Sequence, residues 1–133
     1  MAECLCGTGF PSHKRHKNPN IHFYHQITLR THGVRRAGSA ALDLSSVASG
    51  RLDAFWEFNL NPWDTAAGAL LVEEAGGAIT DMTGGQWHLD SRETLATNSL
   101  VHAEFVRIME DILAGRGLEE LPNARGRAWQ REE

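Results

Sequence analysis

The chain has 133 residues, enough for one domain whose core buries well over half of its surface. Its net charge of -4 argues against a nucleic-acid binder held by phosphate contacts, because such proteins are usually basic. No apolar run approaches the length of about 18 residues that a membrane span needs. The opening MAECLCGTGFP lacks the basic and apolar regions of a secretion signal. Cys4 and Cys6 are too close together to staple a fold and too few to complete a zinc site. We therefore expect a cytoplasmic protein without a nucleic-acid or membrane partner.

The first part of the chain predicts a strand, a turn and a helix. The strand runs from Glu3 to Gly9, where glycines and a proline end it. Residues 12–20 (SHKRHKNPN) are polar and basic, which is typical of an exposed turn. Residues 21–31 place Phe23 and Ile27 at helical spacing and favour a helix.

A short strand and a capped helix are predicted next. Residues 32–38 (HGVRRAG) indicate a strand that ends at Gly38. Ser39 is expected to cap the following helix, which ends at Gly50. One face of this helix carries small and apolar residues, namely Ala40, Ala41, Leu44, Val47 and Ala48.

Residues 52–58 (LDAFWEF) alternate in the manner of a strand. We expect one side to carry Leu52, Ala54, Trp56 and Phe58, and the other to carry Asp53, Phe55 and Glu57. The next helix begins at Pro62, and two glycines end it at 76–77. Its buried stripe is predicted to consist of Ala67, Leu70, Leu71 and Ala75.

The last part predicts two strands and a helix. The strands are expected at 78–82 and 95–98, with a tight turn at 83–85 (TGG). Ser99 begins a helix whose apolar residues recur at helical spacing, namely Val101, Phe105, Ile108 and Leu113. Residues 1–117 form the expected subdomain, and the polar segment 118–133 is expected to be a poorly ordered tail. Because strands alternate with helices, we predict an α/β layered fold.

Two carboxylates stand out as candidates for chemistry. Asp64 lies in the first turn of a predicted helix, where the macrodipole favours a negative charge, so capping alone would explain it. Glu57 is harder to explain, because it is surrounded by aromatic residues and an unpaired buried carboxylate costs several kcal/mol. An acid at the carboxyl edge of a sheet also lies where α/β proteins bind ligands. The helix start at Ser39 and Ala40 adds backbone N–H groups that can face an anion or a hydroxyl.

The histidines do not form an obvious metal site. Four of them fall around the polar turn and the helix that follows it, without an acidic or cysteine ligand nearby: His13, His16, His22 and His25. We expect these four on the solvated surface. His88 and His102 are isolated, and we expect them at the surface or at its boundary.

Taken in order, several segments resemble the carboxyl-terminal half of the inositol monophosphatase family: GTGFP, RRAGSAALDLSSVASGRLDAFWE, NPWDTAAGALLVEEAGG, TDMTGG and LATN. The resemblance covers about residues 6–113. Its most specific part is Trp-Asp followed by small residues and then Glu-Ala-Gly-Gly. It implies a layered mixed sheet with flanking helices, the C-terminal subdomain of the sugar phosphatase fold. It also implies a Mg²⁺-dependent phosphomonoesterase, and many relatives are dimers.

The resemblance implies roles for particular residues. Asp64 matches the aspartate that helps to hold a second Mg²⁺ ion, and Glu57 matches the acid that hydrogen-bonds a substrate hydroxyl. Ser39 and Ala40 match the helix start that meets the sugar or inositol ring through backbone groups. Arg35 and Arg36 are implied either to support this loop or to take part in a dimer contact.

The chain also departs from the family. Members carry a Gly-Glu-Glu segment and the motif Asp-Pro-Leu-Asp-Gly-Thr, which supply most metal ligands, and neither occurs here. We therefore expect the C-terminal part of an enzyme that hydrolyses inositol monophosphate, inactive alone and associating as a homodimer or with a missing N-terminal half. Alternatives are a relative acting on fructose bisphosphate, histidinol phosphate or phosphoadenosine phosphate, and a non-catalytic interaction module or decayed gene fragment. The surface that meets the missing half is expected to be apolar.

Overall fold

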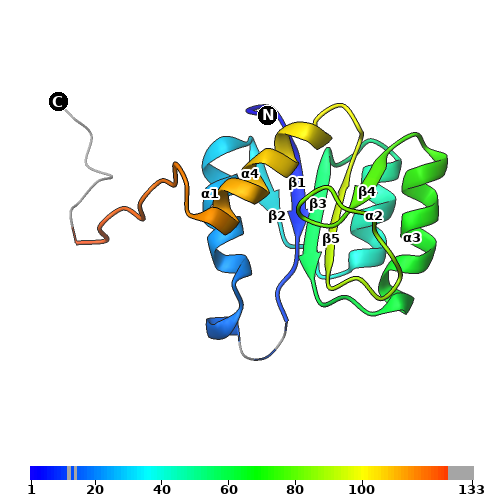
Figure 1. The fold of residues 1–133 in the computed structure, drawn as a ribbon, viewed down its shortest axis with the longest axis horizontal. Helices are drawn as coiled ribbons and strands as arrows, with labels where there is room; N and C mark the ends of the chain where they lie inside the picture. Colours follow the sequence, from blue (N-terminus) through cyan, green and yellow to red (C-terminus); the bar gives the residue numbers. More distant parts are fainter. Residues whose placement is uncertain (12, 14, 126–133) are drawn as a thin grey trace.

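The computed structural model describes residues 1–11, 13 and 15–125, and these build one mixed sheet between helices (Figure 1). The strands are β1 (Leu5–Thr8), β2 (Gly33–Arg35), β3 (Ala54–Phe58), β4 (Ala78–Thr80) and β5 (Glu93–Thr97). The helices are α1 (Asn20–Arg30), α2 (Ala40–Ala48), α3 (Pro62–Glu74) and α4 (His102–Ala114), with a short 3-10 helix, η1, at Arg15–Lys17. In the part of the chain that is described, none of the helices has the length and apolar character needed to cross a membrane.

The strand order is β2-β1-β3-β5-β4. β1 runs parallel to both β2 and β3, whereas β5 is antiparallel to β3 and β4. The carboxyl ends of β1, β2 and β3 therefore meet at one edge of the sheet, the lower edge in Figure 1. This arrangement confirms the predicted α/β fold with a layered mixed sheet and flanking helices.

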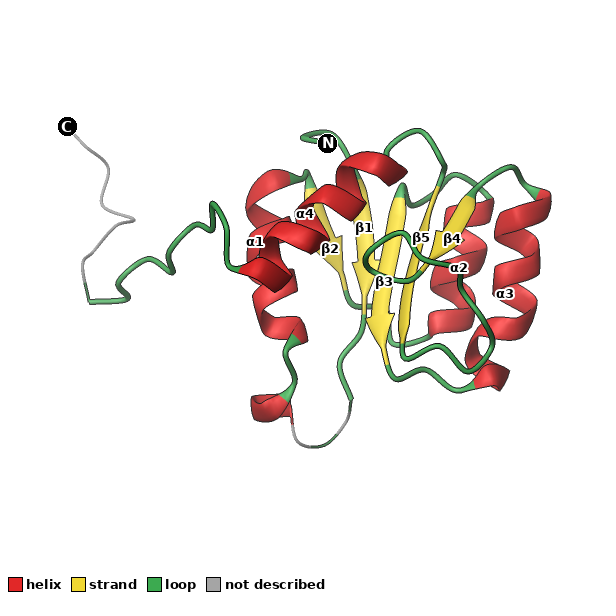
Figure 2. Ribbon diagram, in the orientation of Figure 1, coloured by secondary structure: helices red, strands yellow, loops and turns green. Residues whose placement is uncertain are grey.

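Helices cover both faces of the sheet (Figure 2), and each face has its own apolar core. On the side of α1 and α4, the buried cluster is built around Trp56, Phe23, Ile27, Phe105 and Met109. On the side of α2 and α3, it consists of Leu44, Val47, Leu52, Phe55, Val72 and Ala96. The alternation predicted for β3 holds from Ala54 onward, but Leu52 lies on the other side, with Phe55. Leu52 precedes the strand, which begins at Ala54, so the strand's two-residue period does not extend to it.

The buried side of α3 differs from the predicted stripe. The buried residues are Thr65, Gly68, Ala69 and Val72, whereas the predicted Ala67, Leu70, Leu71 and Ala75 are all exposed. The reason is close packing between α3 and α2. A Cβ atom on Gly68 would lie 2.5 Å from the Cβ of Leu44 in α2, so the helices approach through their smallest residue and turn the leucines outward.

Two other helices also bury a different set from the predicted one. In α2, Leu44 and Val47 are buried together with Asp43, while Ala41 is exposed. In α4, the core residues are Phe105, Met109 and Ile112, and Leu113 is exposed. Residues 12–20 were predicted as an exposed turn, but the described part of this segment contains η1 and ends in the fully buried Asn20.

Candidate functional site

A cavity of about 570 Å³ opens at the carboxyl edge of the sheet. Its wall comes from the ends of β1 and β3, from the segment before α2 and from the first turns of α2 and α3. The structure brings together five of the six residues singled out in the sequence, which all line this cavity: Arg36, Ser39, Ala40, Glu57 and Asp64. The sixth, Arg35, is the exposed last residue of β2 and lies outside the lining.

Glu57 reaches the cavity from β3 and is half-buried. Its carboxylate lies against Gly9, where a Cβ atom would overlap it, so a larger residue at position 9 would displace the carboxylate. Burial, together with the smaller effect of the negative charges of Asp43 and Asp64, raises the pKa of Glu57 to about 7. Glu57 is therefore a carboxyl group that exchanges its proton near neutral pH, able both to accept and to donate a hydrogen bond.

Asp64 combines the two interpretations that the sequence left open. Its Oδ2 accepts a hydrogen bond from the N–H of Asn61 at 2.9 Å, as expected of an acid in the first turn of a helix. The N–H of Asp64 also donates to the carbonyl oxygen of Asn61 at 2.9 Å. The first contact fixes the side chain at the start of α3, and Asp64 also lines the cavity. Capping and a role in the site are thus compatible in one residue.

The main chain at the start of α2 is accessible from the cavity. Ser39 caps the helix, and its Oγ accepts a hydrogen bond from the N–H of Leu42 at 3.3 Å. Gly38 precedes it with a φ of +92°, a conformation that residues with side chains rarely adopt. Gly38, Ser39 and Ala40 all line the cavity, and none of them carries a bulky side chain. A ligand can therefore approach the backbone at this helix start.

Arg36 is positioned by aromatic residues at the rim of the cavity. The carbon of its guanidinium lies 4.4 Å from the centre of the Phe10 ring, a cation–π contact. Phe10 in turn meets the ring of Tyr24 edge-on, with the two centroids 5.9 Å apart. The aromatic pair ties the segment after β1 to α1 and supports the arginine at the cavity wall.

Asp43 is a cavity residue that the sequence reasoning missed. It lies in α2, is only 4% exposed, and lines the cavity together with Glu57 and Asp64. Burial raises its pKa to about 6. A signal was present in the sequence, because Asp43 is four residues before Val47 and three after Ala40 on the expected buried face of that helix.

Asn20 was also missed, and it connects three elements beneath the cavity. It is fully buried, and its Nδ2 donates to the Oγ1 of Thr8 at 3.0 Å and to the carbonyl oxygen of Gly9 at 2.8 Å. Its Oδ1 accepts from the indole N–H of Trp56 at 2.6 Å. The Thr8 hydroxyl donates to the carbonyl oxygen of Trp56 at 2.7 Å. These partners are 11 to 48 positions apart in the sequence, so no local pattern marks them.

His102 is the histidine with the most defined surroundings. Its Nε2 lies 2.8 Å from the Oγ1 of Thr80, and its Nδ1 lies 3.0 Å from the Oγ1 of Thr97. Burial lowers its pKa, so the neutral ring is favoured. The ring joins the start of α4 to β4 and β5, away from the cavity. This is the boundary position that the sequence indicated.

The cavity does not hold a complete metal site of its own. Three carboxylates line it, but among the described residues no group of three His, Cys, Asp or Glu side chains is placed to hold a metal ion. Mg²⁺ prefers near-octahedral coordination by oxygen atoms and gives up its waters reluctantly. The donor set of this chain therefore does not fit a Mg²⁺ ion without ligands from elsewhere.

Comparison with known proteins agrees with this geometry. The model of the inositol monophosphatase family matches residues 1–114. The putative Nus factor SuhB of Neisseria meningitidis serogroup B is 47% identical over 110 residues, which cover 82% of this chain and 42% of that protein. The inositol-1-monophosphatase of Mesorhizobium japonicum is 40% identical over 117 residues, covering 87% and 44%.

Solved structures show the same relationship. The inositol monophosphatase from Anabaena (Nostoc) sp. PCC 7120 superposes with a TM-score of 0.78 at 40% identity, covering 84% of this chain and 46% of that one. The chain thus spans less than half the length of these relatives, and it matches them over most of its own length. The resemblance noted in the sequence is confirmed, and the chain belongs to the inositol monophosphatase family.

Proposed function

We propose that the chain supplies the substrate-binding, carboxyl-terminal part of a Mg²⁺-dependent phosphatase that hydrolyses inositol monophosphate to inositol and phosphate. One observation carries the proposal: the helix start at Ser39 and Ala40, Glu57 on β3 and Asp64 on α3 all line a single cavity. These three kinds of group are suited, in turn, to a polyol ring, a ring hydroxyl and a metal ion. Membership of the family supports the same assignment.

In this proposal, Glu57 and the start of α2 orient the substrate. The carboxylate of Glu57 accepts a hydrogen bond from a polyol hydroxyl, and the absence of a side chain at Gly9 leaves room for it in the position where it does so. The small residues Ser39 and Ala40 let the ring approach the backbone of α2. Asp64 contributes one carboxylate to a metal site whose other ligands lie outside this chain.

The chain alone is expected to lack phosphatase activity. One ligating carboxylate cannot compete with water for Mg²⁺. Without the metal, the main stabilisation of charge in the transition state is missing. The activity therefore belongs to a complete enzyme, in which a second part provides the remaining ligands.

The test is release of phosphate from inositol 1-phosphate. The chain should release none by itself, and release should require Mg²⁺ and admixture of the amino-terminal half of a family member. Asp64→Asn keeps an oxygen to accept the Asn61 N–H but removes the charge, so it should abolish the release. Asp81→Asn is the matched control and should leave it unchanged. Asp81 also accepts backbone N–H groups in a turn, but it lies outside the cavity.

Two results would contradict the proposal. Phosphate release by the chain alone, abolished by Asp64→Asn, would show that the site is complete. The mixture could instead release phosphate from fructose bisphosphate, histidinol phosphate or phosphoadenosine phosphate and not from inositol 1-phosphate. That result would assign the chain to a different substrate.

A non-catalytic interaction module is the second candidate. The observation that favours it is a group of large apolar side chains at the surface of α2 and α3: Leu42 is 67% exposed, Trp63 79% and Leu70 57%. The relative from Neisseria is named a Nus factor rather than an enzyme. If this candidate is correct, the mixture above should show no phosphatase activity with any of the esters, although the chain binds its partner.

A further inference from the structure

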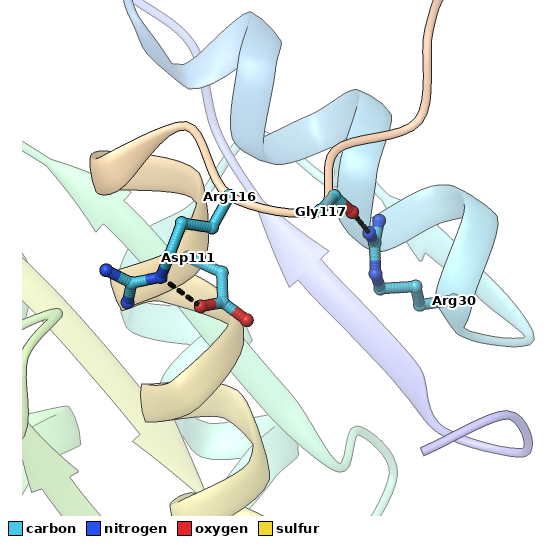
Figure 3. Close-up of polar contacts among 4 residues, drawn as sticks. All are labelled: Arg30, Asp111, Arg116 and Gly117. Atoms are coloured by element: carbon cyan, nitrogen blue, oxygen red, sulfur yellow. Dashed lines mark hydrogen bonds and ion pairs between the residues drawn. The ribbon is translucent and has the colours of Figure 1, made fainter.

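The segment that follows α4 is fastened to α1. Gly115 ends α4 with a φ of +69°, and the chain then passes over α1 (Figure 3). Arg30 in α1 donates from Nη2 to the carbonyl oxygen of Gly117 at 3.1 Å. Two residues later, the main chain of Glu119 is bound on both sides by Gln26. The Oε1 of Gln26 accepts from the N–H of Glu119 at 3.0 Å, and its Nε2 donates to the carbonyl oxygen at 2.7 Å.

Gln26 is also held by contacts within α1. Its Oε1 accepts from the Nη1 of Arg30 at 2.7 Å. Arg30 is fixed in turn, because the same Nη1 donates to the carbonyl oxygen of Gln26 at 2.8 Å. The Nε2 of Gln26 lies 3.1 Å from the Nδ1 of His25. The carboxamide is therefore oriented by α1 itself, with one donor and one acceptor directed outward.

All three contacts with the segment are made to its main chain, namely to Gly117 O, Glu119 N and Glu119 O. None of these three hydrogen bonds involves a side chain of the segment. The paired donor and acceptor of Gln26 meet the N–H and the carbonyl oxygen of one residue, as a strand edge does when it binds a peptide. The family match ends at residue 114, so the segment lies outside it.

We propose that the face of α1 carrying Gln26 and Arg30 is a docking site for a peptide main chain, with residues 117–119 of this chain as its resident occupant. The site is independent of the cavity, whose lining contains neither residue. Because the occupant is tethered directly after α4, it is present at a high effective concentration and excludes competing peptides. A peptide in trans binds only when the resident is released, and it needs an N–H group at the position of Glu119.

The first test is hydrogen exchange at the backbone N–H of residue 119, measured by NMR on the full chain. This N–H should be protected, and Gln26→Leu should make its exchange at least tenfold faster. Arg116→Met is the control, because it removes the exposed ion pair with Asp111 at 3.2 Å beside the segment but none of the three contacts (Figure 3). Glu119→Ala should also keep the protection, since the three hydrogen bonds do not involve the Glu119 side chain.

The second test releases the resident without removing it. Glu119→Pro removes the backbone N–H that donates a hydrogen bond to the Oε1 of Gln26. A fluorescent peptide with the sequence of residues 115–125, GRGLEELPNAR, should then bind the full-length variant in an anisotropy titration. Its binding to the unaltered chain and to Glu119→Ala should be at least tenfold weaker. Glu119→Pro combined with Gln26→Leu should not bind it.

Several outcomes would overturn the proposal. These are fast exchange at residue 119 in the unaltered chain, failure of the peptide to bind Glu119→Pro, and equal binding with and without Gln26. If Gln26→Leu fails to fold, Arg30→Met takes its place and should weaken peptide binding to Glu119→Pro by removing the Gly117 contact. A concentration-dependent dimer that Glu119→Pro abolishes would assign the occupant to a second copy and refute the resident in cis.

Discussion

At the scale of single residues, Glu57 places an ionisable group where folding favours its neutral form. Its pKa is raised to about 7 in the folded chain from an ordinary value of 4.5. Between these values the folded state binds a proton that the unfolded state has released. The stability of the chain should therefore fall as the pH rises from about 4.5 to about 7, and change little from this group above that range.

Replacing Glu57 tests this effect. Glu57→Gln should stabilise the chain at pH 8 by roughly 1–2 kcal/mol, less than the full shift implies because the carboxylate is partly exposed. At pH 4.5 the two chains should be nearly equally stable. Urea unfolding at both pH values measures the difference. A stabilisation of the same size at both would show that the carboxylate is not the cause.

Asn20 is the second prediction at this scale. Asn20→Ala removes the partners of the Trp56 indole and the Gly9 carbonyl, and buried groups left unpaired cost about 1–3 kcal/mol each. We expect a loss of about 2–4 kcal/mol of unfolding free energy in urea. Asn18→Ala is the control, since it removes a side-chain oxygen that accepts from the Asn20 backbone N–H, and it should cost about 1 kcal/mol. Equal losses in the two variants would refute the special role of Asn20.

At the scale of elements, the contact between α2 and α3 depends on the absence of a side chain at Gly68. Ordinarily, alanine in place of glycine favours a helix by about 1 kcal/mol. Here the added Cβ would meet the Cβ of Leu44 at 2.5 Å, so Gly68→Ala should instead destabilise the chain by about 1–3 kcal/mol. A double-mutant cycle with Leu44→Gly is the measurement, because only glycine lacks the Cβ that is met, and the cost of Gly68→Ala should largely vanish in that background.

The elements themselves were largely predictable, and their pairing and burial were not. Gly38 and Gly50 lie just before and just after α2, and both adopt positive φ angles that other residues avoid. The predicted buried stripe of α3 was wrong, because helical spacing alone does not show which face of a helix meets the core. Here the closest contact is made by a glycine, and the leucines face solvent. The strand order was not predicted, since it depends on pairings such as Gly7 with Phe55 that are distant in sequence.

The candidate site was partly predictable for a similar reason. Glu57 and Asp64 were found because one had an unfavourable sequence context and the other lay in a motif. Asp43 was missed, although its helix had been placed correctly, because helical spacing by itself does not say that an acid is buried. Asn20 was missed because all that distinguishes it comes from residues that folding brings near.

At the scale of the whole molecule, the exposed apolar residues predict association. Trp63 is 79% exposed and also lines the cavity, so it lies beside the site that we propose to be incomplete. We expect the chain to self-associate in sedimentation velocity at concentrations of about 100 μM, and Trp63→Gln to shift it towards the monomer.

A matched substitution elsewhere separates this effect from general solubility. Leu89 is 49% exposed and lies in the segment between β4 and β5, outside the cavity. Leu89→Gln should leave the association unchanged. A chain that stays monomeric throughout, or that responds equally to both substitutions, would contradict an interface centred on Trp63.

Trp56 and Glu57 are neighbours on β3, and they point to opposite faces of the sheet. The indole is fully buried and bonded to Asn20, while the carboxylate lies in the cavity. If β3 slipped by one residue along β1, the tryptophan would enter the cavity and the carboxylate would enter the apolar core. Such a slip would cost several kcal/mol for the buried charge alone. The residues that form the site therefore also favour the correct alignment of β3 with β1.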